Sequence, residues 1–88
     1  MVYLIHFDMA LGNERHSAQH YIGYCRSLKQ RLVRHRNGNG ARIIEACNER
    51  GITWQVARTW PDGTRALERQ LKSQKNAKRF CPICRGEH

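Results

Sequence analysis

The stretch HYIGYCRSLKQRLVRHRNG, residues 20–38, decides the fold, because a short β-type run in it leads directly into a basic helical run. Tyrosine and isoleucine at its start favour a strand near residues 19–25. Ser27 lies three residues before a glutamine, which is the spacing of a helix-capping pair, and Asn37-Gly38 is typical of a helix end. The stretch therefore predicts a strand followed by a helix over residues 28–36.

The residues on both sides complete a small α+β domain. The apolar patterns and turn signals predict four further elements, which are a strand at residues 2–7, a helix at 41–50, a strand within 52–60 and a helix from about 64 to 77. A loop that extends to Ala18 joins the first two strands. We therefore expect one domain over residues 1–88 with a three-stranded antiparallel sheet flanked by three helices, in the order β-β-α-α-β-α. Residues 78–88 are expected to form a basic, cysteine-containing tail.

The composition is that of a small, folded and basic protein. The chain has 88 residues, of which 40% are hydrophobic, and 16 Lys and Arg against seven Asp and Glu give a net charge of +9. Such a charge favours polyanionic partners, among which nucleic acid comes first. Since the sequence has no apolar segment of transmembrane length and its start lacks the features of a secretion signal, we expect a soluble, cytoplasmic protein with no membrane partner.

Basic side chains gather on the first predicted helix. Leu28 and Leu32 define its buried stripe, Arg31 and His35 fall together at one edge of that stripe, and Arg34 lies one step further out. An arginine held at such an edge suits bidentate contact with a phosphate. The alternative is that Arg31 and His35 are ordinary surface residues, and the helix considered alone favours this alternative.

Among the seven carboxylates, Glu68 on the last predicted helix is one of two that are expected to face a shaped surface. It borders the stripe of Leu67 and Leu71, whereas most other carboxylates lie in loops, in turns or away from apolar faces. Asp8, at the end of a strand, is the other carboxylate expected to face a shaped surface. The simpler role for Glu68, judged from the residues alone, is an ion pair with Lys72 one turn later.

Two tyrosines lie on strands that are predicted to be adjacent. Tyr3 and Tyr21 could present their hydroxyls on the same face of the sheet, where an arginine or a metal ion could lower a phenol pKa from its ordinary value of about 10. The alternative is that both are core residues with satisfied hydroxyls.

These features occur in a recognisable order. VYL at residues 2–4, HYIGYC at 20–25, Arg31-Leu32 followed by His35, and ALERQLK at 66–72 together resemble the GIY-YIG nuclease superfamily over residues 2 to about 76. The resemblance implies a small antiparallel sheet flanked by helices. It also implies divalent-metal-dependent hydrolysis of DNA phosphodiester bonds, by an endonuclease or nickase.

The resemblance assigns roles to individual residues. Tyr3 and Tyr21 match the two signature tyrosines, one of which would orient or deprotonate the attacking water. Arg31 matches an arginine that contacts phosphate, and His35 matches a histidine that assists as base or hydrogen-bond donor. Glu68 matches the glutamate that binds Mg²⁺ or Mn²⁺.

Contacts with nucleic acid are expected around these residues. Gly23 matches the glycine of YIG, whose missing side chain would let the substrate approach the backbone. The full set of expected contact residues is Gly23, Arg26, Arg34, Arg42, Lys72 and Lys75. We expect DNA as the partner and no small-molecule cofactor. Sequence specificity is expected to be weak and to come from the shape of the substrate, a homodimer or a protein partner.

Two other functions stay open at this point. A non-catalytic basic module that binds DNA or RNA would tolerate the loss of Glu68. A metal-independent RNase that relies on His6, His20 and His35 would survive chelation.

Cys81-Pro-Ile-Cys84 has the two-residue spacing of half a zinc site. A tetrahedral Zn²⁺ would need two further ligands, from Cys25, Cys47, His88 or another histidine. We expect the four cysteines to be reduced thiols packed in a small core, with a structural Zn²⁺ at Cys81/Cys84 as the alternative.

Overall fold

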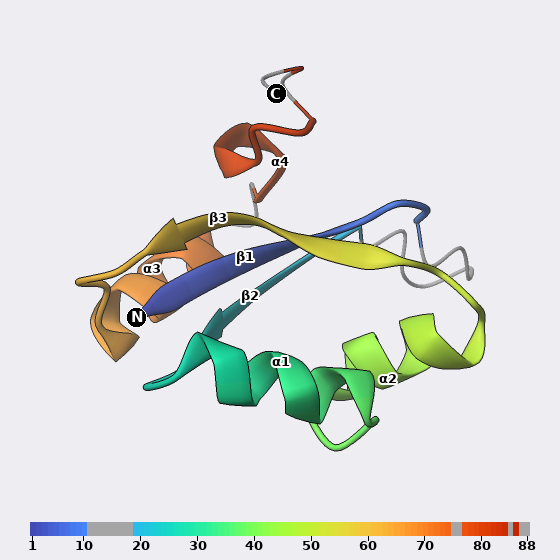
Figure 1. Ribbon diagram of the computed structural model, residues 1–88. Helices are drawn as coiled ribbons and strands as arrows, with labels where there is room; N and C mark the ends of the chain where they lie inside the picture. Colours follow the sequence, from blue (N-terminus) through green and yellow to red (C-terminus); the bar gives the residue numbers. More distant parts are fainter. Residues whose placement is uncertain (11–18, 75–76, 85, 87–88) are drawn as a thin grey trace.

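A computed structural model describes residues 1–10, 19–74, 77–84 and 86 of the chain. Its elements in chain order are β1 (Val2–Phe7), β2 (His20–Tyr24), α1 (Leu28–Arg36), α2 (Arg42–Glu49), β3 (Trp54–Trp60), α3 (Arg65–Ser73) and α4 (Ala77–Phe80). The three strands form one antiparallel sheet in the order β2-β1-β3. The α+β class and the order β-β-α-α-β-α are thereby confirmed, and the single turn of α4 follows them (Figure 1).

Strand β1 is the centre of the molecule and is buried along its whole length. Its side chains alternate between the two faces of the sheet, as they do in any β-strand. Tyr3, Ile5 and Phe7 pack in one core with the apolar side of α2. Val2 and Leu4 pack in a second core with residues of β2, α3 and the C-terminal segment. Both faces of the sheet are therefore covered, which explains why β1 is a continuous apolar run.

The predicted helix boundaries hold closely at most ends. The side chains of Ser27 and Thr64 accept hydrogen bonds from the backbone amides three residues later and so cap α1 and α3. Gly51 has a φ of 70° just after α2, as expected for a glycine that ends a helix. Helix α3 ends at Ser73, with Gln74 as its C-cap, rather than near residue 77, and its last residues are exposed.

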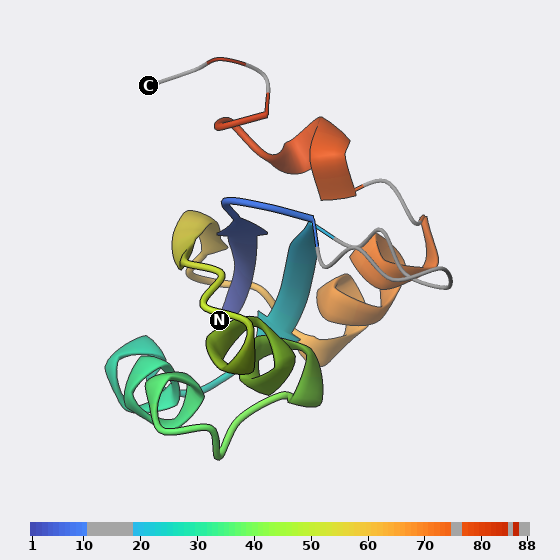
Figure 2. The ribbon, with the colours of Figure 1, turned by 90° about the vertical axis from the view of Figure 1, so that its right-hand side faces the viewer.

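The segment expected to be a tail folds against the sheet. Phe80, Cys81 and Ile83 join the second core beside Val2 and Leu4. Helix α4 lies on the side of the sheet away from α1 and α2 in both Figure 1 and Figure 2. Most of the loop expected before Ala18 falls at residues 11–18, outside the described residues. Within the described part of the chain, every helix is too short and too polar to cross a membrane.

Candidate active site

Three side chains predicted for the site meet on the face of the sheet that α1 and α2 cover. Tyr3 on β1 pairs with Gly23 on β2, and Tyr21 lies two residues before that glycine, so the two tyrosines are diagonal neighbours on one face. Their ring centroids are 6.0 Å apart, and the ring of His35 lies 5.9 Å from Tyr3 and 5.8 Å from Tyr21. The Tyr3 hydroxyl is 2.8 Å from Nε2 of His35. Residues far apart in the sequence thus form one polar cluster.

Gly23 makes room for this cluster. A Cβ atom at this position would lie 2.5 Å from the Tyr3 hydroxyl oxygen and 2.9 Å from a ring carbon of Tyr21, too close for either ring to stay in place. The space that we expected the substrate to use is therefore filled by the Tyr3 ring. Direct contact of Gly23 with the substrate stays a prediction.

The hydrogen bonds of His35 define which of its nitrogens carries the proton. The ring is fully buried, and Nδ1 accepts a hydrogen bond from the backbone N–H of Ala41 at 3.4 Å. Since a backbone amide only donates, the proton of the neutral ring lies on Nε2, which donates to the Tyr3 hydroxyl. The Tyr3 hydroxyl accepts this hydrogen bond and keeps its own proton for another partner.

Burial keeps both members of this hydrogen bond neutral. Desolvation lowers the pKa of His35, and the positive charges of Arg31 and Arg34 lower it further. Desolvation raises the pKa of Tyr3, and the neighbouring Tyr21 adds to this effect. Arg31 pulls the phenol pKa down, as the sequence suggested for an arginine, but burial outweighs it. The expectation of a lowered phenol pKa is therefore wrong for Tyr3.

An arginine-lined cleft of about 350 Å³ opens between the start of α1 and the start of α3. The residues that line it are Tyr24, Cys25, Arg26, Ser27, Gln30, Arg31, Arg34 and Arg65. The guanidinium of Arg65 lies 4.7 Å from the centroid of the Tyr24 ring, in a cation–π arrangement. Four guanidinium groups around one opening present forked N–H donors, whose geometry suits bidentate contact with phosphate oxygens.

Glu68 lies on α3, one turn after Arg65, and its side chain is only 16% exposed. Lys72 lies 3.5 Å from Oε2 of Glu68, and the same ammonium group lies 5.6 Å from the centroid of the Tyr21 ring. Lys72 therefore connects Glu68 with the tyrosine cluster across the edge strand β2. The ion pair expected from the residues alone is present, but its distance exceeds that of a direct N–H···O hydrogen bond, which is roughly 2.7–3.2 Å.

The other described carboxylates lie elsewhere. Asp8 is exposed at the end of β1, where it accepts a hydrogen bond from the Thr53 hydroxyl and does not line the cleft. The remaining carboxylates of the described residues, all exposed, are Glu45, Glu49 and Asp62. Glu68 is thus the one partly buried carboxylate in the described part of the chain.

A comparison with protein families identifies the family of this chain. The model of the GIY-YIG catalytic domain matches residues 1–80 of the 88-residue chain. The chain belongs to the GIY-YIG family. Membership confirms the resemblance seen in the sequence and supports a nuclease-type function. Searches of the curated proteins and of the solved structures found no match to this chain.

In this GIY-YIG domain, some of the residues predicted to contact nucleic acid line the cleft and others do not. Arg26 and Arg34 line the cleft, whereas Arg42 is exposed on α2 and does not line it. Lys75 lies outside the described residues. Arg65 was missed by sequence reasoning, although its place one turn before Glu68 on the same helix was a usable signal.

The histidines of the GIY-YIG domain do not form one site. His35 contacts Tyr3 on the face covered by α1 and α2. His6 and His20 lie on the opposite face with Cys81 and Cys84, in a group of four side chains that could hold a metal ion. A single RNase centre built from the three histidines is therefore inconsistent with the fold.

Proposed function

We propose that this GIY-YIG domain is a metal-dependent DNA endonuclease or nickase, which hydrolyses phosphodiester bonds by in-line attack of water. The observation that carries the proposal is that Lys72 links a partly buried carboxylate, Glu68, to Tyr21 of the Tyr3–Tyr21–His35 cluster, while Arg65, one turn before Glu68 on α3, lines the arginine-lined cleft. Membership in a nuclease family supports it.

The cleft supplies the contacts that DNA phosphates need. Arg31 lines it and also lies close enough to shift the pKa values of both Tyr3 and His35. A phosphate bound to Arg31 would therefore lie next to the tyrosine cluster. There the guanidinium would neutralise the negative charge that builds on the phosphoryl oxygens as water attacks. Arg26, Arg34 and Arg65 would hold the adjoining backbone.

Glu68 fits a Mg²⁺ or Mn²⁺ ion. These hard cations prefer oxygen ligands, and Mg²⁺ is commonly held by one or two carboxylates together with waters and substrate phosphate oxygens. One carboxylate, one turn after the cleft residue Arg65 on α3, meets this requirement. When bound, the ion acts as a Lewis acid that stabilises charge on the leaving oxygen.

The tyrosine cluster would place the attacking water. Because the pKa of Tyr3 is raised, this phenol stays protonated near neutral pH and acts as a hydrogen-bond partner rather than as a pre-ionised base. His35 orients the Tyr3 hydroxyl from behind through its Nε2–H. Tyr21 is only partly buried and would contact the water from the same face. Attack on phosphorus breaks the opposite P–O bond and leaves one phosphate end and one hydroxyl end.

A basic module that binds DNA or RNA without cleavage is the second candidate function. The four arginines of the cleft would serve it equally well. However, such a module gains nothing from a carboxylate that is only 16% exposed one turn after Arg65 of the cleft, because the charge of Glu68 repels phosphate. The position of Glu68 therefore favours cleavage.

The state of the cysteines and the size of the domain bear on where the protein acts and on how it selects its substrate. All four cysteines are free, which fits a reducing compartment, so we propose that the protein acts in the cytoplasm. The small surface left for reading bases points to the shape of the substrate, a homodimer or a protein partner as the source of specificity.

Cleavage of supercoiled plasmid tests the proposal. The wild-type protein is expected to nick or linearise plasmid with Mg²⁺ or Mn²⁺ and to stop when EDTA is added. Glu68→Gln is expected to lower the rate about 100-fold or more, since it keeps the shape of the side chain and removes the charge. Glu45→Gln, which changes an exposed carboxylate on α2, is the matched control and should cleave at the wild-type rate.

Three results would count against the proposal. Cleavage that persists in EDTA would exclude the metal dependence. Cleavage by Glu68→Gln at the wild-type rate would exclude the role of Glu68. Binding of plasmid and of branched DNA without cleavage under either metal would favour the binding module.

A further inference from the structure

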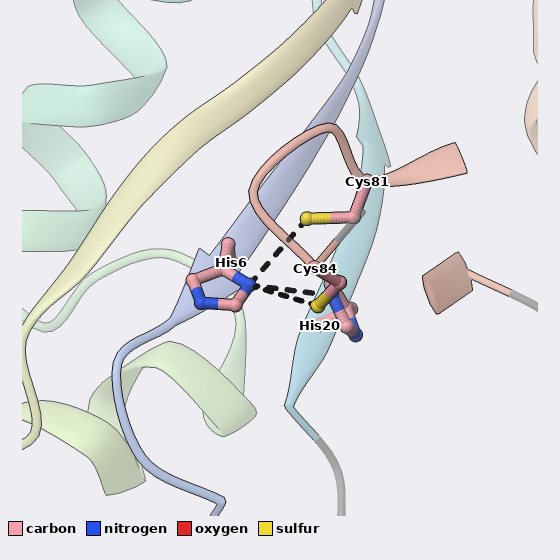
Figure 3. Close-up of side chains that lie close together, drawn as sticks. All are labelled: His6, His20, Cys81 and Cys84. Atoms are coloured by element: carbon pink, nitrogen blue, oxygen red, sulfur yellow. Dashed lines mark hydrogen bonds between the residues drawn. The ribbon is translucent and has the colours of Figure 1, made fainter. Parts of the chain in front are cut away.

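Four side chains with nitrogen or sulfur ligand atoms converge on the face of the sheet opposite the tyrosine cluster. They are His6 on β1, His20 on β2 and the two cysteines of the Cys81-Pro82-Ile83-Cys84 turn after α4. One ligand atom from each lies within 4.8 Å of the other three. Figure 3 shows the four side chains pointing toward one another from three separate segments of the chain.

The fold brings the two histidines together through strand pairing. His6 and His20 are directly opposite each other in the antiparallel register of β1 and β2. Side chains in such a pair project from the same face, with Cβ atoms roughly 4.5–5.5 Å apart. Their ring centroids are 5.2 Å apart. Pairing of β1 with β2 thus supplies two of the four ligands.

The C-terminal segment supplies the other half. Cys81 is fully buried and packs in the second core with Val2, Leu4 and Ile22, which holds the turn against the sheet. Cys84 follows after two residues, the spacing at which both thiols of a turn can reach one metal ion.

Four of the six distances between the ligand atoms lie close to the edges of a metal-centred tetrahedron, and all six are within 4.8 Å. Bonds of about 2.0 Å from zinc to nitrogen and about 2.3 Å to sulfur give edges of roughly 3.3–3.8 Å. Nδ1 of His6 lies 3.4 Å from Nε2 of His20, 3.4 Å from Sγ of Cys81 and 3.5 Å from Sγ of Cys84. Nε2 of His20 lies 3.2 Å from Sγ of Cys84.

Hydrogen bonding alone does not explain this arrangement. Nδ1 of His6 carries either one proton or one lone pair, so it serves one hydrogen bond at a time. Three ligand atoms nevertheless approach it at nearly equal distances. A cation at their common centre satisfies all four groups at once.

We propose that His6, His20, Cys81 and Cys84 bind one structural Zn²⁺, at a site separate from the divalent cation of Glu68. Two cysteines and two histidines in a closed tetrahedron are a typical ligand set for structural zinc. Both thiols would lose their protons to solvent on binding. The ion would tie the C-terminal segment to residues that precede it by 64 and 75 positions in the chain.

The structure narrows the ligand candidates that were considered from the sequence. Cys25 and Cys47 lie in the core on the other face of the sheet, so neither belongs to the cluster. His88 lies outside the described residues. The open alternative of another histidine is the one that the proposal takes up, with His6 and His20 as the two further ligands of Cys81 and Cys84.

Metal analysis of the full-length wild-type protein is the first test. Protein purified without added chelator should contain one zinc per chain by mass spectrometry. After the zinc has been removed, titration with Co²⁺ should saturate at one equivalent. It should give the strong visible d–d bands of a tetrahedral ion and a sulfur-to-cobalt charge-transfer band. Chelation should lower Tm by about 10 °C or more.

Two ligand variants and a matched control complete the test. Cys84→Ser and His20→Ala change half-buried side chains, and each should lose most of the bound zinc. Cys47→Ala removes a buried thiol from the opposite core and should keep one zinc per chain even if it is less stable.

The proposal would be overturned by wild-type protein that contains no zinc and binds Co²⁺ only in an octahedral form. Iron in place of zinc, or zinc retained by both ligand variants, would also overturn it. The cobalt spectrum of the wild-type protein decides the question even if a variant fails to fold.

Discussion

At the scale of single residues, the tyrosine cluster depends on two glycines, Gly23 and Gly40. Gly23 leaves room for the rings of Tyr3 and Tyr21. Gly40 passes so close to His35 that a Cβ atom would lie 2.1 Å from Nδ1 of the ring. The absence of a side chain therefore lets the chain bury a hydrogen-bonded Tyr3–His35 pair.

Gly23→Ala should damage the site more than it damages the fold. The new methyl group must displace the Tyr3 ring, and overpacking of this kind costs about 1–3 kcal/mol of unfolding free energy. Urea denaturation measures this cost. The rate of plasmid nicking should fall by more than the decrease in the folded fraction of the protein accounts for.

Gly51→Ala is the control, since Gly51 has a φ of 70° but open space around it. The control should lose about 1–2 kcal/mol of stability and retain nicking by the folded fraction. Equal loss of nicking in the two variants would contradict this role of Gly23.

His35 should make folding stability depend on pH. Its folded-state pKa is lowered, so below about pH 6.5 the unfolded chain takes up a proton that the folded protein resists. The contribution of His35 is therefore complete above the unfolded pKa and is lost as the pH falls below it. Urea denaturation at pH 7.5 and pH 5.5 should show a larger loss for the wild type than for His35→Gln. Other histidines contribute equally to both proteins, so parallel losses would refute the prediction.

At the scale of elements, α3 decides whether Glu68 reaches the site. The helix is capped by Thr64 and packs one buried side chain, Leu71, into the second core. Glu68 precedes Leu71 by three residues and lies at the edge of that buried face. The contact of Leu71 with the sheet therefore also positions the carboxylate.

Leu71→Ala should be among the costly substitutions in this domain. Leu71 is 5% exposed, and truncation of such a residue costs about 2–5 kcal/mol. This is a large share of the roughly 5–15 kcal/mol that stabilises a typical domain. Thermal or urea unfolding measures the loss. Val33→Ala, on the exposed side of α1, is the matched apolar control and should change stability by less than about 0.5 kcal/mol. A similar effect of both variants would show that α3 is not anchored through Leu71.

At the scale of the whole molecule, four of the 16 Lys and Arg residues behind the net charge of +9 are arginines gathered at the cleft. Arg58 lies on β3, at the other edge of the sheet from β2. A charge distribution of this kind predicts that binding depends on a few defined phosphate contacts as well as on the overall field.

The salt dependence of DNA binding tests this distribution. In EDTA, the slope of log K against log salt concentration should become shallower by about 1 in Arg34→Ala, because one phosphate contact is lost. Arg58→Ala removes the same charge from the far edge and should leave the slope nearly unchanged. Equal changes in the two variants would indicate diffuse attraction instead of binding in the cleft.

The sequence by itself determined the element order, most element boundaries and the family. These depend on local patterns, namely the apolar run of β1, the capping residues Ser27 and Thr64, and the ordered motif from Tyr3 to Glu68. Such signals act over a few residues, or recur in a fixed order, and need no knowledge of distant contacts.

Only the tertiary structure decided how these residues meet. The burial that raises the pKa of Tyr3 and lowers that of His35 comes from packing between β1, α1 and the Gly40 loop. Arg65 joins the cleft because α3 begins beside α1. His6 and His20 meet Cys81 and Cys84 because strand register and a C-terminal turn place them on one face. Each of these results depends on contacts between residues far apart in the chain, which determine burial and convergence and leave no local pattern in the sequence.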